Sequence, residues 1–435
     1  MVSQSTSFTS SNISYPPTLL PLQSPHRIGR KIVPNRILFQ PMEGCDGTAE
    51  GAPGELTLRR YLRFAEGGAG VVWVEATAIR PEARANPRQL WLHNGTVDAF
   101  AALAMAIRVA CLHTNGYAPL LILQLTHSGR YSKPQGKPAP LIAYNNPLFE
   151  STPISEDCIL SDDQLKSLEE DFGTAAKLAE QAGFDGVDIK ACHRYLLSEL
   201  LSAYERPGAY GGSFANRTRL YRNAITAAKA SVSGDFIVTS RLNAYDGFPY
   251  PYGFGVTADS ADDAYGIPVP DYTEAIRLAQ ELHTEYQMPL LNITIGNPYV
   301  NPNVNRPADT PQNRAIEPPQ VGVERIIHAA AVIQESVPEL PICASGFSYL
   351  RGEAVNAAAA FIGAGKAAFA GFGRMAFAYP DFYKDALAGE LNPSKLCLAC
   401  GKCSQLMRAG TVAGCPVRDS EIYMPYYKEH VLHRT

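Results

Sequence analysis

Eight short apolar runs, separated by stretches with helical periodicity, set the tightest limit on how this 435-residue chain can fold. Each run has the length of a buried strand, and several of the intervening stretches end at a glycine, as helix C-termini prefer. The runs cover residues 37–41, 71–75, 119–125, 185–190, 235–241, 289–294, 341–345 and 367–371. Eight consecutive strand–helix units predict an α/β fold, a (β/α)8 TIM barrel, whose core takes about 250 residues.

The alternative α/β architecture is a doubly wound sheet, but no G-x-G-x-x-G opens a helix after the first predicted strand. We therefore favour the barrel. Its excess length falls in three long segments that follow strands, residues 126–160, 242–270 and 295–319. In a barrel these loops share the C-terminal face, where active sites lie. The second holds five aromatic residues between Tyr245 and Phe254, which favours a lid over a flat, partly apolar ligand rather than mobile padding.

Charge and apolar patterning limit the partners and the location. The formal net charge is -4 and no basic run occurs, which argues against nucleic acid or a membrane surface as partner. Neither a signal-peptide pattern nor a run of about 18 apolar residues is present, so we expect a cytoplasmic protein that acts on a small-molecule substrate. We also expect a homo-oligomer. The chain divides into a flexible N-terminal segment (1–25), the barrel (26–392) and a Cys-rich extension (393–435).

Four of the nine cysteines crowd into this extension as Cys397-x2-Cys400-x2-Cys403-x11-Cys415. The odd total and the lack of an export signal argue against a disulfide framework. Thiols at this spacing predict a soft-metal site, either a tetrahedral zinc ion or an iron–sulfur cluster. Zinc sites more often use two separated C-x2-C pairs. We therefore favour a [4Fe-4S] cluster, with zinc or a metal-free thiol group as alternatives.

Polar residues at the predicted strand ends are the candidates for chemistry. They are Gln124, Lys190, Arg241, Ser345 and Arg374, with His127 and His193 just beyond their strands. The segments Ser345-Gly-Phe347 and Gly371-Phe-Gly-Arg374 follow the seventh and eighth strands, where barrels often bind phosphate. Backbone N–H groups near glycine and a guanidinium suit a phosphate-bearing ligand, although glycines also serve tight turns.

The segment after the fourth strand, Lys190-Ala-Cys-His-Arg-Tyr195, concentrates a cation, an imidazole and a phenol. A helical turn there would bring Lys190 and His193 together, with Tyr195 close by. These three groups can polarise a carbonyl and supply a proton.

Four longer motifs carry a family resemblance. They are Asn35-Arg-Ile-Leu-Phe-Gln-Pro-Met42, Gln124-Leu-Thr-His-Ser-Gly-Arg130, Gly183-Phe-Asp-Gly-Val-Asp-Ile-Lys-Ala-Cys-His-Arg-Tyr-Leu-Leu197 and Tyr210-Gly-Gly-Ser-x2-Asn-Arg217. On these motifs the chain resembles the old yellow enzyme-like FMN oxidoreductases. Within them it looks most like the iron–sulfur branch that contains 2,4-dienoyl-CoA reductase and trimethylamine dehydrogenase. The resemblance runs from about Asn35 to the cysteine group, which is most of the chain.

The resemblance implies FMN as the cofactor, with NADH or NADPH as a possible reductant. The residues that it places around the flavin and its phosphate are Pro41, Met42, Glu43, Ala76, Gln124, Arg241, Ser345, Gly346, Phe347, Gly373 and Arg374. In the family's ene-reductases a hydride passes from flavin N5 to the β-carbon of an activated alkene, and a tyrosine protonates the α-carbon. Tyr195 matches that tyrosine, and Lys190 and His193 match the carbonyl-binding pair.

The chain departs from the family pattern in several places. Lys190 stands where the ene-reductases usually have histidine, and Arg194 replaces a usual glycine. Glu43 would face the flavin edge, where a carboxylate alters the flavin potential or serves as a base. The iron–sulfur relatives continue into further domains, whereas this chain ends at Thr435. We therefore expect FMN to be reduced either directly by NAD(P)H or through the cluster by a separate electron-donor protein.

The leading hypothesis is an FMN-dependent oxidoreductase that reduces the C=C bond of an α,β-unsaturated carbonyl compound or acid. One alternative is an amine dehydrogenase or demethylase on the same barrel, for which Glu43 would supply a negative charge. The other is a flavin/iron–sulfur electron-transfer protein that acts with a partner and has no substrate chemistry of its own.

Overall fold

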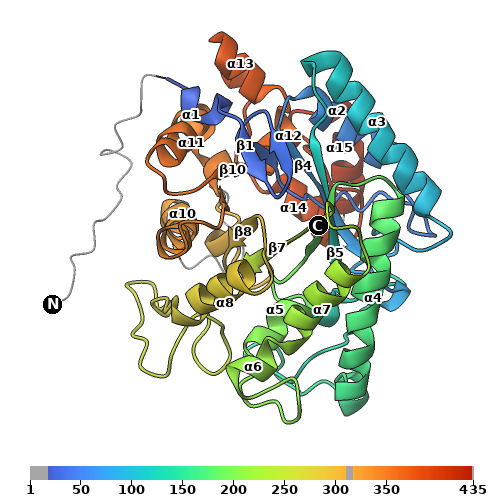
Figure 1. The fold of residues 1–435 in the computed structure, drawn as a ribbon, viewed down its shortest axis with the longest axis vertical. Coiled ribbons are helices and arrows are strands. Elements are labelled where there is room, and N and C mark those ends of the chain that lie inside the picture. The colour runs from blue at the N-terminus through green and yellow to red at the C-terminus, as the bar shows by residue number, and fades with distance from the viewer. Residues whose placement is uncertain (1–17, 310–316, 434–435) are drawn as a thin grey trace.

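The computed structural model, which describes residues 18–309 and 317–433, is a closed barrel of eight parallel strands surrounded by helices (Figure 1). The strands follow one another around the barrel in chain order, and the last pairs with the first. They are β3 (Ile37–Phe39), β4 (Val71–Ala78), β5 (Leu120–Thr126), β6 (Gly186–Ile189), β7 (Ile237–Asn243), β8 (Leu291–Thr294), β9 (Ile342–Ser345) and β10 (Phe369–Phe372). Each of the eight apolar runs overlaps one strand, so the predicted barrel is confirmed.

The barrel strands are buried along their whole length, because side chains fill the barrel inside and helices cover it outside. This is why they read in the sequence as continuous apolar runs. The helices that return the chain between strands are α2 (Glu55–Glu66), α3 (Val97–Asn115), α4 (Asp162–Gln181), α7 (Arg219–Ala230), α8 (Thr273–Thr284), α10 (Pro319–Ser336) and α11 (Ala354–Gly363). After the last strand, α13 (Phe382–Ala388) packs against the barrel.

Two of these helices show how the sequence sets local structure. At the start of α4 the Ser161 hydroxyl accepts the backbone N–H of Gln164 at 3.2 Å, and the Gln164 side chain accepts that of Ser161 at 2.8 Å. This reciprocal cap fixes where the helix begins.

Among the described helices, α3 alone is long and apolar enough to cross a membrane by length and composition. It packs Phe100, Leu103 and Ile107 into the core of the barrel.

A short hairpin closes the N-terminal end of the barrel, and the sequence pattern did not predict it. Its strands are β1 (His26–Ile28) and β2 (Lys31–Val33), and Ile28 and Val33 pack on the starts of the barrel strands. Before it, α1 (Leu20–Gln23) holds a fully buried Leu22. The packed chain therefore begins before the predicted boundary at residue 26. Residues 1–17 of the segment predicted to be flexible lie outside the described residues.

Short helices and the C-terminal extension occupy the opposite end. The short helices are α5 (Leu196–Leu201), α6 (Phe214–Arg217), α9 (Pro302–Asn305) and α12 (Arg374–Ala378), and the extension contains α14 (Lys402–Arg408) and α15 (Ser420–Tyr427). Asp419 accepts hydrogen bonds from Arg59 and Arg63 of α2. Leu406 and Tyr423 belong to a small apolar cluster that also contacts α2. These contacts hold the extension against the barrel beside the loops of the C-terminal face.

Candidate active site

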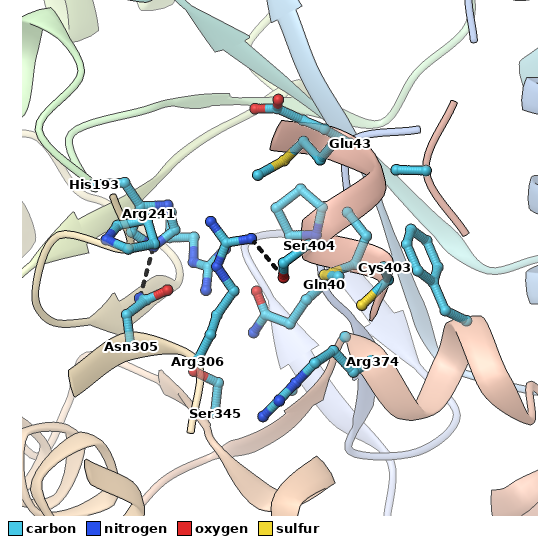
Figure 2. Close-up of a pocket in the computed structure, with 18 of the residues that line it drawn as sticks. Gln40, Glu43, His193, Arg241, Asn305, Arg306, Ser345, Arg374, Cys403 and Ser404 are labelled. Carbon is cyan, nitrogen blue, oxygen red and sulfur yellow. Dashed lines mark hydrogen bonds between the residues drawn. The ribbon is translucent and has the colours of Figure 1, made fainter. Parts of the chain in front are cut away.

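A pocket opens at the carboxyl ends of the barrel strands, where residues from different strands converge (Figure 2). The twelve predicted residues that line it are Pro41, Met42, Glu43, Gln124, Lys190, His193, Tyr195, Arg241, Ser345, Gly346, Gly373 and Arg374. Parallel strands bring their carboxyl ends to one face, which is why residues far apart in the sequence meet here. Ala76 and Phe347 do not line the pocket and are buried in the core instead. Of the four clustered cysteines, Cys403 reaches it.

One side of the pocket suits a phosphate group. Ser345 ends β9 and Gly346 follows it, and Gly373 and Arg374 follow β10. Gly346 has a φ of 110°, which a residue with a side chain rarely adopts. A Cβ atom on Gly373 would lie 2.7 Å from the Met42 sulfur, so only glycine lets the backbone approach so closely. The Arg374 guanidinium donates to the carbonyl oxygen of Pro307 at 2.6 Å, which orients it.

A buried carboxylate, Asp188 of β6, organises the floor of the pocket. It accepts hydrogen bonds from the Gln124 side chain at 2.6 Å, the Trp73 indole at 2.9 Å and the Arg241 backbone N–H at 2.7 Å. Burial raises the pKa of Asp188 to about 6, although these donors favour the anion. At neutral pH an ionised Asp188 therefore fixes Gln124 and Arg241. Asp188 was not among the residues predicted from the sequence, although an acidic residue between Val187 and Ile189 of a buried strand could have pointed to it.

Across the pocket, Glu43 joins two of the predicted catalytic residues. The Lys190 ammonium lies 3.4 Å from Glu43 Oε1, and the Tyr195 hydroxyl donates to the same oxygen at 3.2 Å. The ammonium also lies 3.6 Å from the centre of the Tyr195 ring. Burial, and then the Glu43 charge, raises the pKa of Tyr195 well above its ordinary value. Tyr195 consequently keeps its proton across the physiological range.

The third predicted catalytic residue, His193, is neutral. Burial, and then the charges of Arg241 and Lys190, lowers its pKa well below the ordinary value. His193 Nε2 lies 2.9 Å from Asn305 Nδ2, which also donates to the carbonyl oxygen of Ile295. Because Asn305 Nδ2 is a donor, His193 Nε2 accepts and the ring proton resides on Nδ1. The imidazole can therefore donate one hydrogen bond through Nδ1.

Arg194, which stands at a usual glycine position, turns away from this pocket. Its backbone has a φ of 61°, and its fully buried guanidinium pairs with Asp246 at 3.0 Å and donates to the Tyr144 hydroxyl at 3.1 Å. Burial lowers the pKa of Arg194, but these partners outweigh it and raise the pKa above the ordinary value. Arg194 therefore ties two of the long loops together rather than taking part in the site.

The loop after β8 supplies residues that the sequence analysis did not single out. Tyr299, Asn305 and Arg306 line the pocket. Tyr299 shares a hydrogen bond with the Tyr195 hydroxyl at 3.1 Å and stacks on Tyr131 with ring centres 3.9 Å apart. The sequence feature that could have pointed to these three residues is their position in a long loop on the C-terminal face of the barrel.

The aromatic segment between Tyr245 and Phe254, predicted to be a lid, contributes no residue to the pocket lining. Tyr245 and Phe254 are fully buried in the core. Phe248 packs against Phe149, and Tyr250, which is 43% exposed, packs against Tyr204. The prediction of a lid was therefore wrong for this structure, because the aromatic side chains pack in the core or on other loops instead of covering the pocket.

Of the four cysteines of the extension, Cys397 and Cys400 precede α14, Cys403 lies in its first turn and Cys415 follows it. The N–H of Ala399 donates to the Cys397 sulfur, and the N–H of Arg418 donates to the Cys415 sulfur, both at 3.4 Å. Ala399 has a φ of 52°, which bends the chain sharply between Cys397 and Cys400. Among the described residues, no three Cys, His, Asp or Glu side chains converge closely enough to hold a single metal ion. The predicted metal site at Cys397, Cys400, Cys403 and Cys415 stays a prediction.

Comparisons with known proteins identify relatives of this chain. The model of the NADH:flavin oxidoreductase / NADH oxidase family matches residues 21–258. The NADPH dehydrogenase of Bacillus pumilus is 32% identical over 234 residues, which make up 52% of this chain and 64% of that protein. The chain thus spans less than two thirds of the length of the curated relatives it matches.

Two solved structures are similar over nearly the whole chain. The complex of 2-naphthoyl-CoA reductase with 2-naphthoyl-CoA has a TM-score of 0.73 at 20% identity, and covers 92% of this chain and 57% of that chain. Histamine dehydrogenase from Rhizobium sp. 4-9 has a TM-score of 0.69 at 21% identity, and covers 91% and 52%. At such identities the likeness shows the shared fold.

Proposed function

Because the chain belongs to the NADH:flavin oxidoreductase / NADH oxidase family, we propose that its pocket binds FMN and reduces the C=C bond of an α,β-unsaturated carbonyl compound or acid. NADH or NADPH serves as the reductant in this proposal. The observation that carries it is the meeting of two hydrogen-bond donors, Lys190 and His193, with a protonated phenol, Tyr195, in one pocket.

The residues around the pocket fit FMN. Arg241 Nε is buried and has no hydrogen-bond partner among the described residues, so it is free to donate to a ligand. Gln124 and Arg241 would contact the ring, and Ser345, Gly346 and Arg374 would hold the phosphate. Bound FMN would supply the hydride that reduces the β-carbon of the alkene.

The protein side chains would polarise the substrate and protonate it. Lys190 has three N–H bonds, and after one is given to Glu43 the others can donate to a substrate carbonyl together with His193 Nδ1. Such donors stabilise the negative charge that develops on the carbonyl oxygen. Tyr195 would then protonate the α-carbon. The nearby ammonium of Lys190 would stabilise the phenolate that is left beside Glu43.

We propose further that Cys397, Cys400, Cys403 and Cys415 hold a [4Fe-4S] cluster. A cluster of this kind takes one thiolate at each of its four irons, so its ligands need not converge on one point, whereas a zinc ion requires them to. The N–H donors to two of the sulfurs support the thiolate form. Since Cys403 borders the flavin pocket, electrons from a separate donor protein would pass to FMN at this edge.

Amine oxidation is the second candidate. Glu43 places a carboxylate among Tyr131, Tyr195 and Tyr299, and such a group can receive a substrate ammonium. The ion pair between Lys190 and Glu43 weighs against it, because the negative charge is already neutralised.

Anaerobic half-reactions distinguish these candidates. Under the leading proposal NADH or NADPH bleaches the flavin of the loaded protein, and cyclohexenone restores its absorbance. If trimethylamine or histamine bleaches the flavin and no enone restores it, the protein is an amine dehydrogenase. If neither class reacts but a chemically reduced electron carrier bleaches the flavin, it is an electron-transfer protein.

A further inference from the structure

Arg306, in the loop after β8, carries a positive charge in the pocket that no acidic residue among those described neutralises. Its guanidinium donates to the Ser404 hydroxyl at 3.2 Å (Figure 2). None of the carboxylates among the described residues lies within ion-pair distance of it. Glu43 is the one acid among the residues that line the pocket, and it is already engaged by Lys190 and Tyr195.

The surroundings of Arg306 place it on the substrate side. Burial, the charges of Arg241 and Lys190, and then the charge of Arg306 lower the pKa of His193. Burial and the Glu43 charge raise the pKa of Tyr299, and the Arg306 charge opposes this rise, so Arg306 lies near residues that would hold and orient a substrate. Burial, and then the charge of Arg306, lowers the pKa of Arg408, which donates to the carbonyl oxygen of Pro298 at 3.0 Å. Arg408 does not itself line the pocket, but its guanidinium lies near that of Arg306, and both raise the positive potential that an arriving anion meets.

Arg306 is distinct from the two cations assigned to FMN. Figure 2 shows its guanidinium directed towards Ser404, whereas the guanidinium of Arg374 points towards Ser345. Arg241 is fixed from the barrel floor by Asp188. With Arg374 on the phosphate, Arg241 on the ring and Lys190 paired with Glu43, the charge of Arg306 is available to the substrate. The same charge, together with that of Arg374, opposes the rise in the pKa of Cys403 that burial causes.

We propose that Arg306, with Arg408 behind it, binds a carboxylate on the substrate, and that the protein acts on activated alkenes that carry such an acid group. The inference rests on the proposed ene reduction. A guanidinium meets a carboxylate through two parallel N–H···O bonds, which fixes the position of the alkene as well as adding affinity. The carboxylate is unchanged in the reaction; the alkene takes up a hydride and a proton, and the flavin supplies the two electrons.

The probes are β-acetylacrylate and its methyl ester, which share one enone and differ in the negative charge. Binding of each to the oxidised, FMN-loaded protein is measured by the change in flavin absorbance, which needs no turnover. Hydrogen bonds to a charged group contribute about tenfold to 100-fold in affinity, so the acid should bind better than the ester by about this factor. Arg306→Gln should remove the preference and leave ester binding within about twofold, and Arg306→Lys should keep part of it.

A matched control is Arg277→Gln on α8, where the guanidinium is exposed and pairs with Glu281 outside the pocket. This variant should keep the full preference for the acid. The inference is overturned if Arg306→Gln leaves the ratio of acid to ester affinity unchanged. It is also overturned if the variant weakens FMN binding to the apoprotein without changing that ratio, because Arg306 would then belong to the phosphate site. If the acid binds tightly but neither probe reoxidises the reduced protein, the proposed ene reduction fails while the carboxylate site stands.

Discussion

Replacing either partner of the Lys190–Glu43 pair should destabilise the protein far more than an exposed ion pair would. The two side chains are only 4% and 13% exposed and lie 3.4 Å apart. At an effective dielectric constant of about 20, unit charges at this distance attract by about 5 kcal/mol before desolvation is counted. Glu43→Gln keeps a hydrogen-bond acceptor for Lys190 but leaves the buried ammonium without a counter-charge. We expect this variant to lose about 3 kcal/mol of the free energy of unfolding.

A double-mutant cycle isolates the pair. Lys190→Met should cost about 2 kcal/mol, because the Tyr195 hydroxyl still donates to Glu43. The double variant should cost clearly less than the two single changes together, with a coupling energy of about 2 kcal/mol. Urea denaturation of the four FMN-loaded proteins, followed by tryptophan fluorescence and circular dichroism, measures these free energies.

The exposed pair Arg277–Glu281 on α8 is the matched control. Arg277 is 57% exposed, and the two residues are one helical turn apart. Its cycle should give a coupling of about 0.5 kcal/mol or less. A coupling as small as this for Lys190 and Glu43 would refute the reasoning, because it would mean that water already screens the pair and that neither charge depends on the other.

Four further predictions follow from the site. Tyr195→Phe should slow reoxidation of the reduced protein by an enone about 100-fold or more. Tyr299→Phe, which removes a hydroxyl 3.1 Å from the Tyr195 hydroxyl, should slow the same reaction less than tenfold. Equal effects of the two substitutions would show that Tyr195 is not the proton donor. Arg374→Ala should weaken FMN binding at least tenfold in reconstitution of the apoprotein, and unchanged binding would place the phosphate elsewhere. Burial raises the pKa of Asp188 from 3.8 to about 6, so in this window the folded protein holds a proton that the unfolded chain has released, and the free energy of unfolding falls as the pH rises. Between pH 3.8 and about 6, the free energy of unfolding of the wild-type chain should fall by roughly 2–3 kcal/mol relative to that of Asp188→Asn. If the free energies of unfolding of the two proteins changed with pH in parallel, the raised pKa of Asp188 would be contradicted. Cys400→Ser should lower the iron and acid-labile sulfide content of anaerobically purified protein while FMN remains; full iron content would exclude Cys400 as a ligand.

The barrel could be predicted from the sequence because its strands are buried on both faces. A run such as Leu120–Thr126 must then be apolar throughout, and eight such runs leave few other folds possible. The hairpin at the N-terminal end was missed because strands of three residues, His26–Ile28 and Lys31–Val33, are too short to show a periodic pattern.

The strand ends could also be predicted, since barrel geometry gathers them on one face whatever their spacing in the chain. Gln124, Arg241 and Ser345 line the pocket for this reason. The barrel geometry does not fix the positions of loop residues in this way. Arg306 and Tyr299 lie in a segment whose path depends on its packing against Ser404 and its neighbours, and no local pattern reveals it.

The pairing of the two unusual residues is the clearest example of what the sequence alone could not supply. Lys190 and Glu43 each depart from the pattern of the family, and they lie 147 residues apart. Taken singly, each suggested a different substrate. The structure brings their charges together, so that one neutralises the other and both contact Tyr195.

The measurement that tests the proposed function most directly is anaerobic reoxidation of the reduced, FMN-loaded protein by cyclohexenone, with the product identified. The oxidised flavin absorbance should return in a reaction that consumes one enone and forms one cyclohexanone for each flavin. A protein that binds no FMN, or whose reduced flavin persists with every enone tested, would contradict the proposal.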